Sequence, residues 1–101
     1  MYIEVHPAVE GFLKSLDSTT RAKAVRLISL LEKVGYSLRM PYSKPLSKGL
    51  FELRIRGVVE VRIVYTFSGT NIYLLHAIVK KGQRIPRADL VLAQRRRLDR
   101  V

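Results

Sequence analysis

Three apolar runs between residues 51 and 79 constrain the fold of this chain more than any other feature. They are rich in Val, Ile, Leu, Phe and Tyr, and short turn signals separate them, Arg56-Gly57 and the segment 68–71. Such runs predict antiparallel β-strands joined by tight connections. The third run, residues 72–79, is apolar on both faces, which is typical of a central strand.

Alternation along the first two runs gives the predicted sheet one apolar face and one charged face. Successive side chains of a strand point to opposite sides. The apolar side chains fall on one side: Phe51, Leu53, Ile55, Val61, Ile63, Tyr65 and Phe67. Three arginines fall on the other side: Arg54, Arg56 and Arg62. We therefore expect one face to form the wall of the core and the opposite face to carry cations.

Two helices are predicted upstream of these strands, after a short strand at residues 2–5. Pro7 suits the first position of a helix, where its missing N–H costs nothing. The apolar residues that follow it recur at the spacing of one helical stripe. Asp17 supplies a cap for a second helix, and Gly35 suits the end of that helix. The two helices predict an antiparallel hairpin whose apolar stripe packs on the apolar face of the sheet.

The segments around the strands complete the predicted architecture. Residues 36–49 contain two prolines and one glycine, which predicts a loop. Pro86 favours the start of a last helix, which the arginines at 95–97 and 100 make strongly basic. The predicted fold class is α+β: an N-terminal helix hairpin packed on a small antiparallel sheet, with a basic C-terminal helix. At 101 residues, the chain is expected to form one domain, 1–101.

Several classes of protein are disfavoured by composition. The chain has no cysteine, and only His6 and His76 offer imidazole ligands, so we expect no metal site and no cofactor. No apolar run reaches the roughly 18 residues that a membrane helix needs. The N-terminus lacks the order of charged, apolar and small residues that marks a signal peptide. We therefore expect a cytoplasmic protein that does not associate with a membrane.

The charge of the chain is concentrated in its second half. Residues 1–43 hold 6 Lys or Arg against 4 Asp or Glu, whereas residues 44–101 hold 13 against 4. The formal net charge of +11 therefore lies mainly on the predicted sheet and on the segment that follows it. A basic surface of this kind favours a polyanionic partner such as nucleic acid, an anionic membrane or an acidic protein.

The sequence also resembles a known group of proteins. The order of a strand, a helix hairpin, three antiparallel strands and a basic tail resembles the RelE/ParE superfamily of toxins from type II toxin–antitoxin systems. Four phrases, SKPLSKGLFELRI, RIVYTF, LLHAIVKKGQRIP and a helix with A-x-x-R, resemble its phage-derived, HigB-like branch. The resemblance implies an RelE-like toxin that cleaves mRNA as an endoribonuclease in the ribosome. It also implies a cognate antitoxin, one that often carries a helix-turn-helix domain.

The arginine face suits the chemistry that this resemblance implies. Cleaving RNA without a metal requires activation of the ribose 2′-OH, stabilisation of the charge that develops on the phosphate, and protonation of the leaving oxygen. Arginines suit the second task because a guanidinium is always charged and grips phosphate oxygens in a fork. A lysine suits the proton transfers if neighbouring cations and partial burial lower its pKa.

The candidate site residues follow from this chemistry and from the resemblance together. The residues expected to be catalytic are Arg54, Arg62 and Lys81. Those expected to bind RNA are Lys44, Lys48, Arg56, Lys80 and Arg84. The resemblance implies that Arg62, in the phrase RIVY, grips the phosphate. The plainer interpretation of Arg62 is a surface cation paired with Glu60 or Glu52.

The general acid and base stay open at this point. Some toxins of this kind carry a tyrosine in or before the last helix, whereas residues 83–89 contain none here. His76 lies in the middle of a strand, where a core histidine with satisfied hydrogen bonds is favoured over an acid or base.

Other functions on the same fold also remain open. A non-enzymatic, ParE-like gyrase inhibitor is one, although such an inhibitor does not need arginines on the strands. A non-cleaving RNA- or ribosome-binding module is another, although the aromatic residues fall mostly at core positions. A toxin remnant that binds an antitoxin but no longer cuts RNA is the third.

Overall fold

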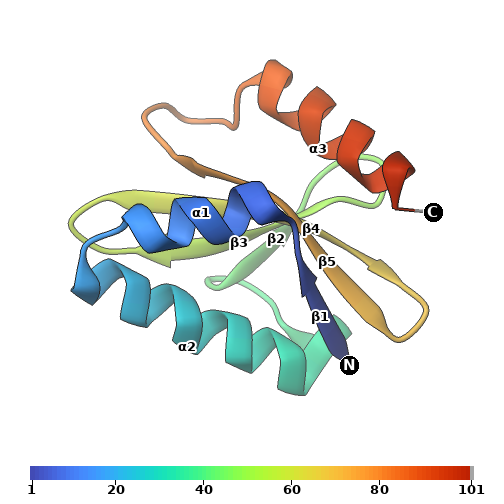
Figure 1. Cartoon of the computed structure of the whole chain (residues 1–101), viewed down its shortest axis with the longest axis horizontal. Coiled ribbons are helices and arrows are strands. Elements are labelled where there is room, and N and C mark those ends of the chain that lie inside the picture. The colour runs from blue at the N-terminus through green and yellow to red at the C-terminus, as the bar shows by residue number, and fades with distance from the viewer. Residues whose placement is uncertain (101) are drawn as a thin grey trace.

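The computed structural model describes residues 1–100 as a sheet with helices on both faces (Figure 1). The elements in chain order are β1 (Tyr2–Val5), α1 (Pro7–Ser15), α2 (Ser18–Val34), the 3-10 turn η1 (Gly35–Ser37), β2 (Ser43–Pro45), β3 (Phe51–Arg56), β4 (Glu60–Ser68), β5 (Asn71–Val79) and α3 (Arg87–Asp99). The three apolar runs of the sequence thus form β3, β4 and β5, as predicted.

The predicted architecture is nevertheless wrong in its order and in its sheet. The first strand, which the predicted fold class left out of the sheet, is part of it, and the sheet has five strands in the order β1-β5-β4-β3-β2. It is a mixed sheet, because β1 pairs in parallel with β5 while the other neighbours are antiparallel. The expectation of a helix hairpin on a small antiparallel sheet is therefore corrected to a mixed α+β fold with three helices.

Two strands account for this difference. The segment 2–5 was recognised as a strand from its residues, but its partner lies about 70 positions away, at the start of β5. A local pattern cannot reveal a parallel pairing of that range, because such strands are joined by a long crossover connection. The short β2 lies inside the segment 36–49, whose prolines predicted a loop. Pro45 is tolerated there because β2 is the edge strand of the sheet.

Local sequence sets the helix ends on this framework. Pro7 is the first residue of α1, and the ring Nδ1 of His6 accepts a hydrogen bond from the N–H of Ala8. Asp17 caps α2 by accepting a hydrogen bond from the N–H of Thr20, 3.0 Å away, and hydrogen bonding to the side chain and then to the backbone of Thr20 lowers the pKa of Asp17. The α2 helix ends at Gly35, whose φ of 53° lies in the left-handed region that favours glycine.

Each face of the sheet is covered by its own layer of helices. The helices α1 and α2 pack on the apolar face that alternation predicted, where Leu53, Ile55, Ile63 and Tyr65 are buried. The helix α3 packs on the other face, above a smaller cluster formed by Leu50, Val64, Leu75, Ile85 and Ala93. The charged face of the sheet is thus partly covered, which the sequence did not predict.

A register shift in β5 places two consecutive leucines in the two apolar clusters, one in each. Val64 pairs with His76 and Tyr65 with Leu74, so that Leu75 is the extra residue of a β-bulge. Leu74 therefore enters the larger cluster and Leu75 the smaller one. Within residues 1–100, no helix is long and apolar enough to cross a membrane.

Candidate functional site

The register of β3 and β4 brings the predicted arginines together. Arg54 lies directly opposite Arg62, and Arg56 lies opposite Glu60. Two like charges at opposite positions destabilise a sheet unless counterions intervene. Glu60 intervenes at one end, where its Oε1 lies 3.6 Å from Nη1 of Arg56 and 3.2 Å from Nη2 of Arg62. Glu52 intervenes at the other end.

Arg62 is buried within this cluster. Only 2% of the residue is exposed, and its Nη1 donates to the carbonyl oxygen of Val61 at 3.0 Å. Its Nη2 donates to Glu60, and its Nε lies 3.4 Å from Oε2 of Glu52. The pairing with Glu60 and Glu52 is the one that the plainer interpretation named, although Arg62 is buried and does not lie at the surface. Alternation fixes the face of a side chain, but it does not indicate whether another layer covers that face.

Arg54 is more accessible than Arg62 and is held less firmly. The side chain of Arg54 is 13% exposed, and its Nη1 donates to Sδ of Met40 at 3.3 Å. Its Nε lies 4.0 Å from Oε2 of Glu52, and this buried nitrogen has no hydrogen-bond partner within the described residues. Glu52 is therefore shared between two guanidinium groups, and Arg54 keeps donors that an incoming phosphate can use.

Lys80 joins the same cluster from the end of β5. Its backbone N–H donates to the carbonyl oxygen of Glu60 at 2.7 Å, and its side chain is half-buried. Partial burial, followed by the charge of Arg62, lowers the pKa of Lys80. Arg54 and Lys44 lower it further, while Glu52 opposes them. A lysine with a lowered pKa among other cations is suited to accept or donate a proton.

The exposed lysine Lys81 was predicted as the catalytic one instead. The structure favours Lys80, since Arg62 pairs with Ile78 and Val64 with His76. Ile78 and His76 therefore share the face of Arg62, and the charge of Arg62 acts on Lys80, one residue past the end of β5. The sequence signal that could have placed Lys80 beside the arginines is its position directly after the last strand residue, Val79.

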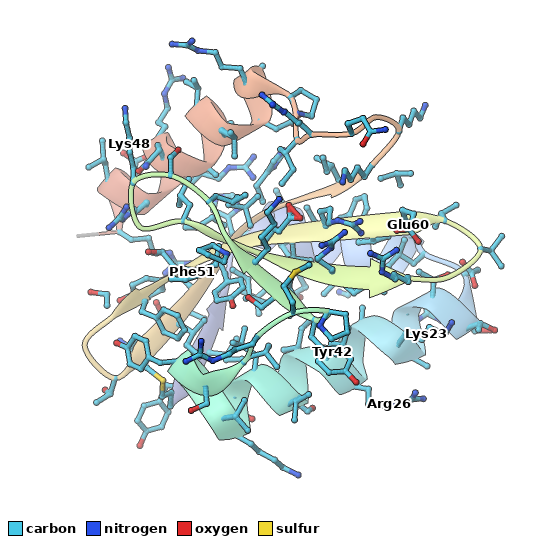
Figure 2. The ribbon with its side chains drawn as sticks, turned by 180° about the vertical axis from the view of Figure 1, so that it is seen from behind. Lys23, Arg26, Tyr42, Lys48, Phe51 and Glu60 are labelled. Carbon is cyan, nitrogen blue, oxygen red and sulfur yellow. The ribbon has the colours of Figure 1, made fainter. Side chains whose placement is uncertain are left out.

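The predicted RNA-binding residues separate into two groups. Lys44 lies opposite Glu52 in the sheet, and it is exposed, as are Arg56 and Arg84, whereas Lys80 is half-buried. Lys48, by contrast, lies at the other end of the sheet from Glu60, beside α3 (Figure 2). Its carbonyl oxygen accepts hydrogen bonds from Gln94 and Arg97 of that helix. Lys48 is therefore not brought together with the arginine cluster.

His76 connects β5 to α3. Its Nε2 lies 2.6 Å from Oδ1 of Asp89, and its Nδ1 lies 3.1 Å from Nη1 of Arg96, which also donates to the carbonyl oxygen of Leu75. The arginine can only donate, so Nδ1 accepts and Nε2 donates to the carboxylate. His76 is a satisfied histidine, as predicted, although its partners Asp89 and Arg96 were not foreseen.

The family of the chain follows from a comparison with known proteins. The model of the family described as phage derived protein Gp49-like (DUF891) matches residues 11–98. The chain belongs to this Gp49-like family. The family is a type II toxin family of the RelE/HigB-like kind, so the broad part of the resemblance is confirmed. No curated protein matches the chain.

The cation cluster is the chemical feature of this Gp49-like chain that suits an anionic substrate. Among the residues that the structure describes, two carboxylates lie with these cations, those of Glu52 and Glu60; the cations are Arg54, Arg56, Arg62, Lys44 and Lys80. Among residues 1–100, no three His, Cys, Asp or Glu side chains are grouped so that they could hold a metal ion. What this Gp49-like site offers is excess positive charge and one lysine suited to proton transfer.

Proposed function

We propose that this Gp49-like protein is the toxin of a type II toxin–antitoxin pair and acts as an mRNA-cleaving endoribonuclease. The whole chain would act as one RelE-like toxin domain on messages bound to the ribosome. The observation that carries the proposal is Lys80, a half-buried lysine of lowered pKa among cations on a sheet face. Membership of the Gp49-like family supports the assignment as a toxin. The cation cluster supports the proposed cleavage of RNA.

The proposed mechanism uses the nucleophile that RNA itself carries. Neutral Lys80 accepts the proton of the ribose 2′-OH as that oxygen attacks the adjacent phosphorus. Arg54 and Arg56 hold the phosphate oxygens and stabilise the charge that builds up on them, a contribution that is often the largest in such reactions. The bond from phosphorus to the 5′ oxygen then breaks and the departing oxygen takes up a proton from water, which leaves a 2′,3′-cyclic phosphate on the upstream product and a 5′-hydroxyl on the downstream one.

Arg62 acts in this proposal through other residues and not by direct contact. It fixes Glu52 and Glu60 by charge-assisted hydrogen bonding and ion pairing, and its own charge lowers the pKa of Lys80. We propose it as a positioning residue. Lys44, Lys81 and Arg84, which are exposed, would contact the RNA backbone on either side of the cleaved bond.

The proposal also implies a second protein. A toxin of +11 formal charge needs an acidic antitoxin, and charge complementarity would make their association fast and dependent on salt. An antitoxin with a helix-turn-helix domain is proposed from the resemblance alone.

Induced expression with mapping of message 5′ ends tests this function. New ends inside translated frames, which disappear when initiation is blocked before induction, are the expected result. Intact messages with arrested replication would instead favour a gyrase inhibitor. Intact messages with inhibited translation would favour a binding module that does not cut.

A further inference from the structure

The strand β3 has an open edge over its last residues. The neighbouring β2 pairs only with Phe51–Leu53, and the last backbone bond on this side runs from the N–H of Arg54 to the carbonyl of Tyr42, 2.8 Å. Hydrogen-bonding directions alternate along an antiparallel strand, so Arg56 turns its N–H and C=O to the same open side. Its carbonyl oxygen accepts a bond from Nζ of Lys23, 3.1 Å away.

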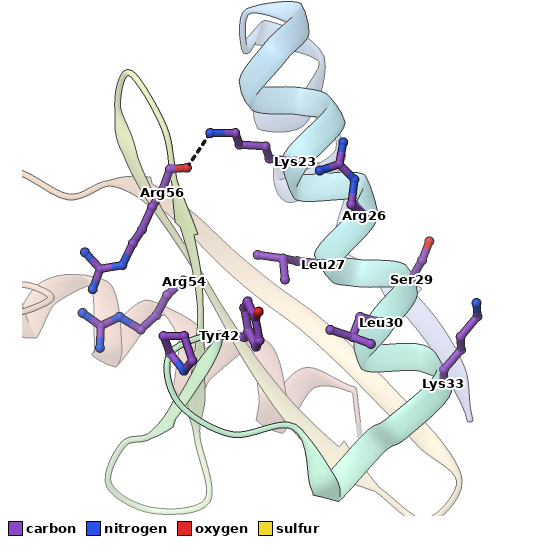
Figure 3. A pocket seen from close by; sticks show the side chains of 10 residues that line it. Lys23, Arg26, Leu27, Ser29, Leu30, Lys33, Tyr42, Arg54 and Arg56 are labelled. Carbon is purple, nitrogen blue, oxygen red and sulfur yellow. Dashed lines mark hydrogen bonds between the residues drawn. The ribbon is translucent and has the colours of Figure 1, made fainter.

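A hollow of about 600 Å³ separates this edge from α2 (Figure 3). Its floor is apolar, because Leu27 and Leu30 project from α2 toward the strand. Pro41 and Tyr42 line it from the segment that precedes β2, and Tyr42 is 46% exposed. Apolar surface of this kind, next to an unpaired strand edge, can receive an added strand.

The rim of the hollow is positively charged. Lys23, Arg26 and Lys33 contribute from α2, and Arg54 and Arg56 contribute from β3. No carboxylate of the described chain lines the hollow. Lys23, Arg26 and Lys33 have no carboxylate beside them in the lining, whereas Arg54 and Arg56 share Glu52 and Glu60 beyond the strand edge. The excess charge around the apolar floor is positive, so the charge of the fitting partner is negative.

The apolar side chains of α2 and the arginines of β3 lie on opposite sides of the open edge of β3. Leu27 and Leu30 point toward β3 from α2, whereas the guanidinium groups of Arg54 and Arg56 point away from α2 (Figure 3). A strand laid beside β3 would place successive side chains on these two sides in turn. Apolar side chains would cover the leucines, and carboxylates between them would meet the arginines.

We infer that the hollow receives an extended partner segment of alternating acidic and apolar residues, which adds a strand to the edge of β3. This inference rests on the proposed function only for the partner, which would be the antitoxin. The inserted carboxylates would occupy Arg54 and Arg56, so the same contact that binds the partner would block the phosphate. An RNA strand fits the hollow less well, because its lining offers only one aromatic side chain, Tyr42, for base stacking.

The binding test uses a short acetylated and amidated peptide in which glutamate and valine alternate. Titrated into the isotope-labelled full chain, it should shift the amide resonance of Arg56 downfield and protect that amide from exchange. A peptide of the same composition, with its glutamates in one block, should bind at least about tenfold more weakly. Two further peptides carry N-methyl groups at alternate peptide bonds, one at the odd-numbered bonds and the other at the even-numbered bonds. Only one of the two should lose binding, because only one edge of the added strand faces β3.

Paired variants locate the site. Leu30→Glu should weaken peptide binding about tenfold, whereas Val25→Glu, on the same helix outside the hollow, should not. Arg26→Glu should likewise weaken binding, and Arg95→Glu, an equal charge change on α3, should have a much smaller effect. The amide spectrum of each variant shows whether it is folded, so a loss of binding by a folded variant at either groove position supports the inference.

Several results would overturn the inference. Binding that is insensitive to N-methylation would exclude strand addition, and binding unaffected by both groove variants would exclude the hollow. If unstructured oligouridylate shifts the amide resonances of residues that line the hollow and the peptide does not, the hollow binds RNA instead of a protein segment. The failure of this inference can be distinguished from the failure of the proposed nuclease. If the protein binds the peptide but cuts no message, the proposed nuclease is wrong and this inference stands. If the protein cuts messages but does not bind the peptide, this inference is wrong and the proposed nuclease stands.

Discussion

Oε2 of Glu52 lies 3.4 Å from Nε of Arg62, and both side chains are almost fully buried on the face of the sheet that alternation marks as charged. Burying two ions is costly unless each keeps its partner. Glu60 adds a second carboxylate to the same guanidinium. The buried pair is therefore part of the framework that holds Arg54 and Lys80, and it can be tested as such.

Arg62→Ala is expected to destabilise the protein by about 3–5 kcal/mol, because it leaves the buried Glu52 without its closest counterion. Urea unfolding of the variant measures this loss. Arg56→Ala is the control, since the side chain of Arg56 is 58% exposed and its removal should cost no more than about 1 kcal/mol. Equal stability of the two variants would contradict the framework role, whereas lost toxicity of Arg62→Ala alone would not identify a catalytic residue.

The two adjacent lysines offer a matched test of the proton transfer. Lys80→Met should lower the cleavage rate at saturating RNA about 10²–10⁴-fold, the usual contribution of a general base. Lys81→Met removes the same charge from an exposed position and should change mainly the affinity for RNA. Single-turnover cleavage of a ribosome-bound message separates the two effects. Similar losses of rate in both variants would mean that Lys80 and Lys81 act only through their positive charge and that Lys80 is not the general base.

Several features of this fold were predictable from the sequence, and the reasons for the failures are physical. The three apolar runs predicted β3, β4 and β5 because strand periodicity is local. The same periodicity placed Arg54 and Arg62 on one face, and the structure brings them together there. It could not show that α3 covers part of that face, since the helix lies far along the chain. The burial of Arg62 and the parallel partner of β1 both depend on such distant packing.

The pH dependence of cleavage should reveal the environment of Lys80. A lysine acts as a base only when neutral, so the rate should rise with pH and level off above a pKa that lies below the usual 10.5. Lys44 is one of the cations that lower this pKa. Removing it in Lys44→Gln should therefore raise the pKa and move the whole profile to higher pH. A profile that shifts to lower pH, or not at all, would exclude Lys80 as the base.

The contact of His76 with Asp89 should control how firmly α3 is held on the sheet. Asp89→Asn keeps the size of the side chain but removes the charged acceptor 2.6 Å from Nε2 of His76. The expected loss is about 1–3 kcal/mol, with faster amide exchange along α3 than along β4. Asp99→Asn, at an exposed position of the same helix, should leave exchange unchanged. If amide exchange along α3 is equally slow in the wild type, Asp89→Asn and Asp99→Asn, then α3 is held by its apolar contacts alone.

The chemistry of the cut ends decides the mechanism. If the 2′-OH of the substrate attacks, a single 2′-deoxy or 2′-O-methyl substitution at the cleaved nucleotide should stop the reaction. The upstream product should carry a 2′,3′-cyclic or a 3′-phosphate. Cleavage should also survive EDTA wherever the assay leaves the ribosome intact, or on any free RNA that is cut, because the cations of the cluster do the work that a metal ion would otherwise do. A 3′-hydroxyl on the upstream product would mean that water attacked, and the roles given to Lys80 and Arg54 would then be wrong.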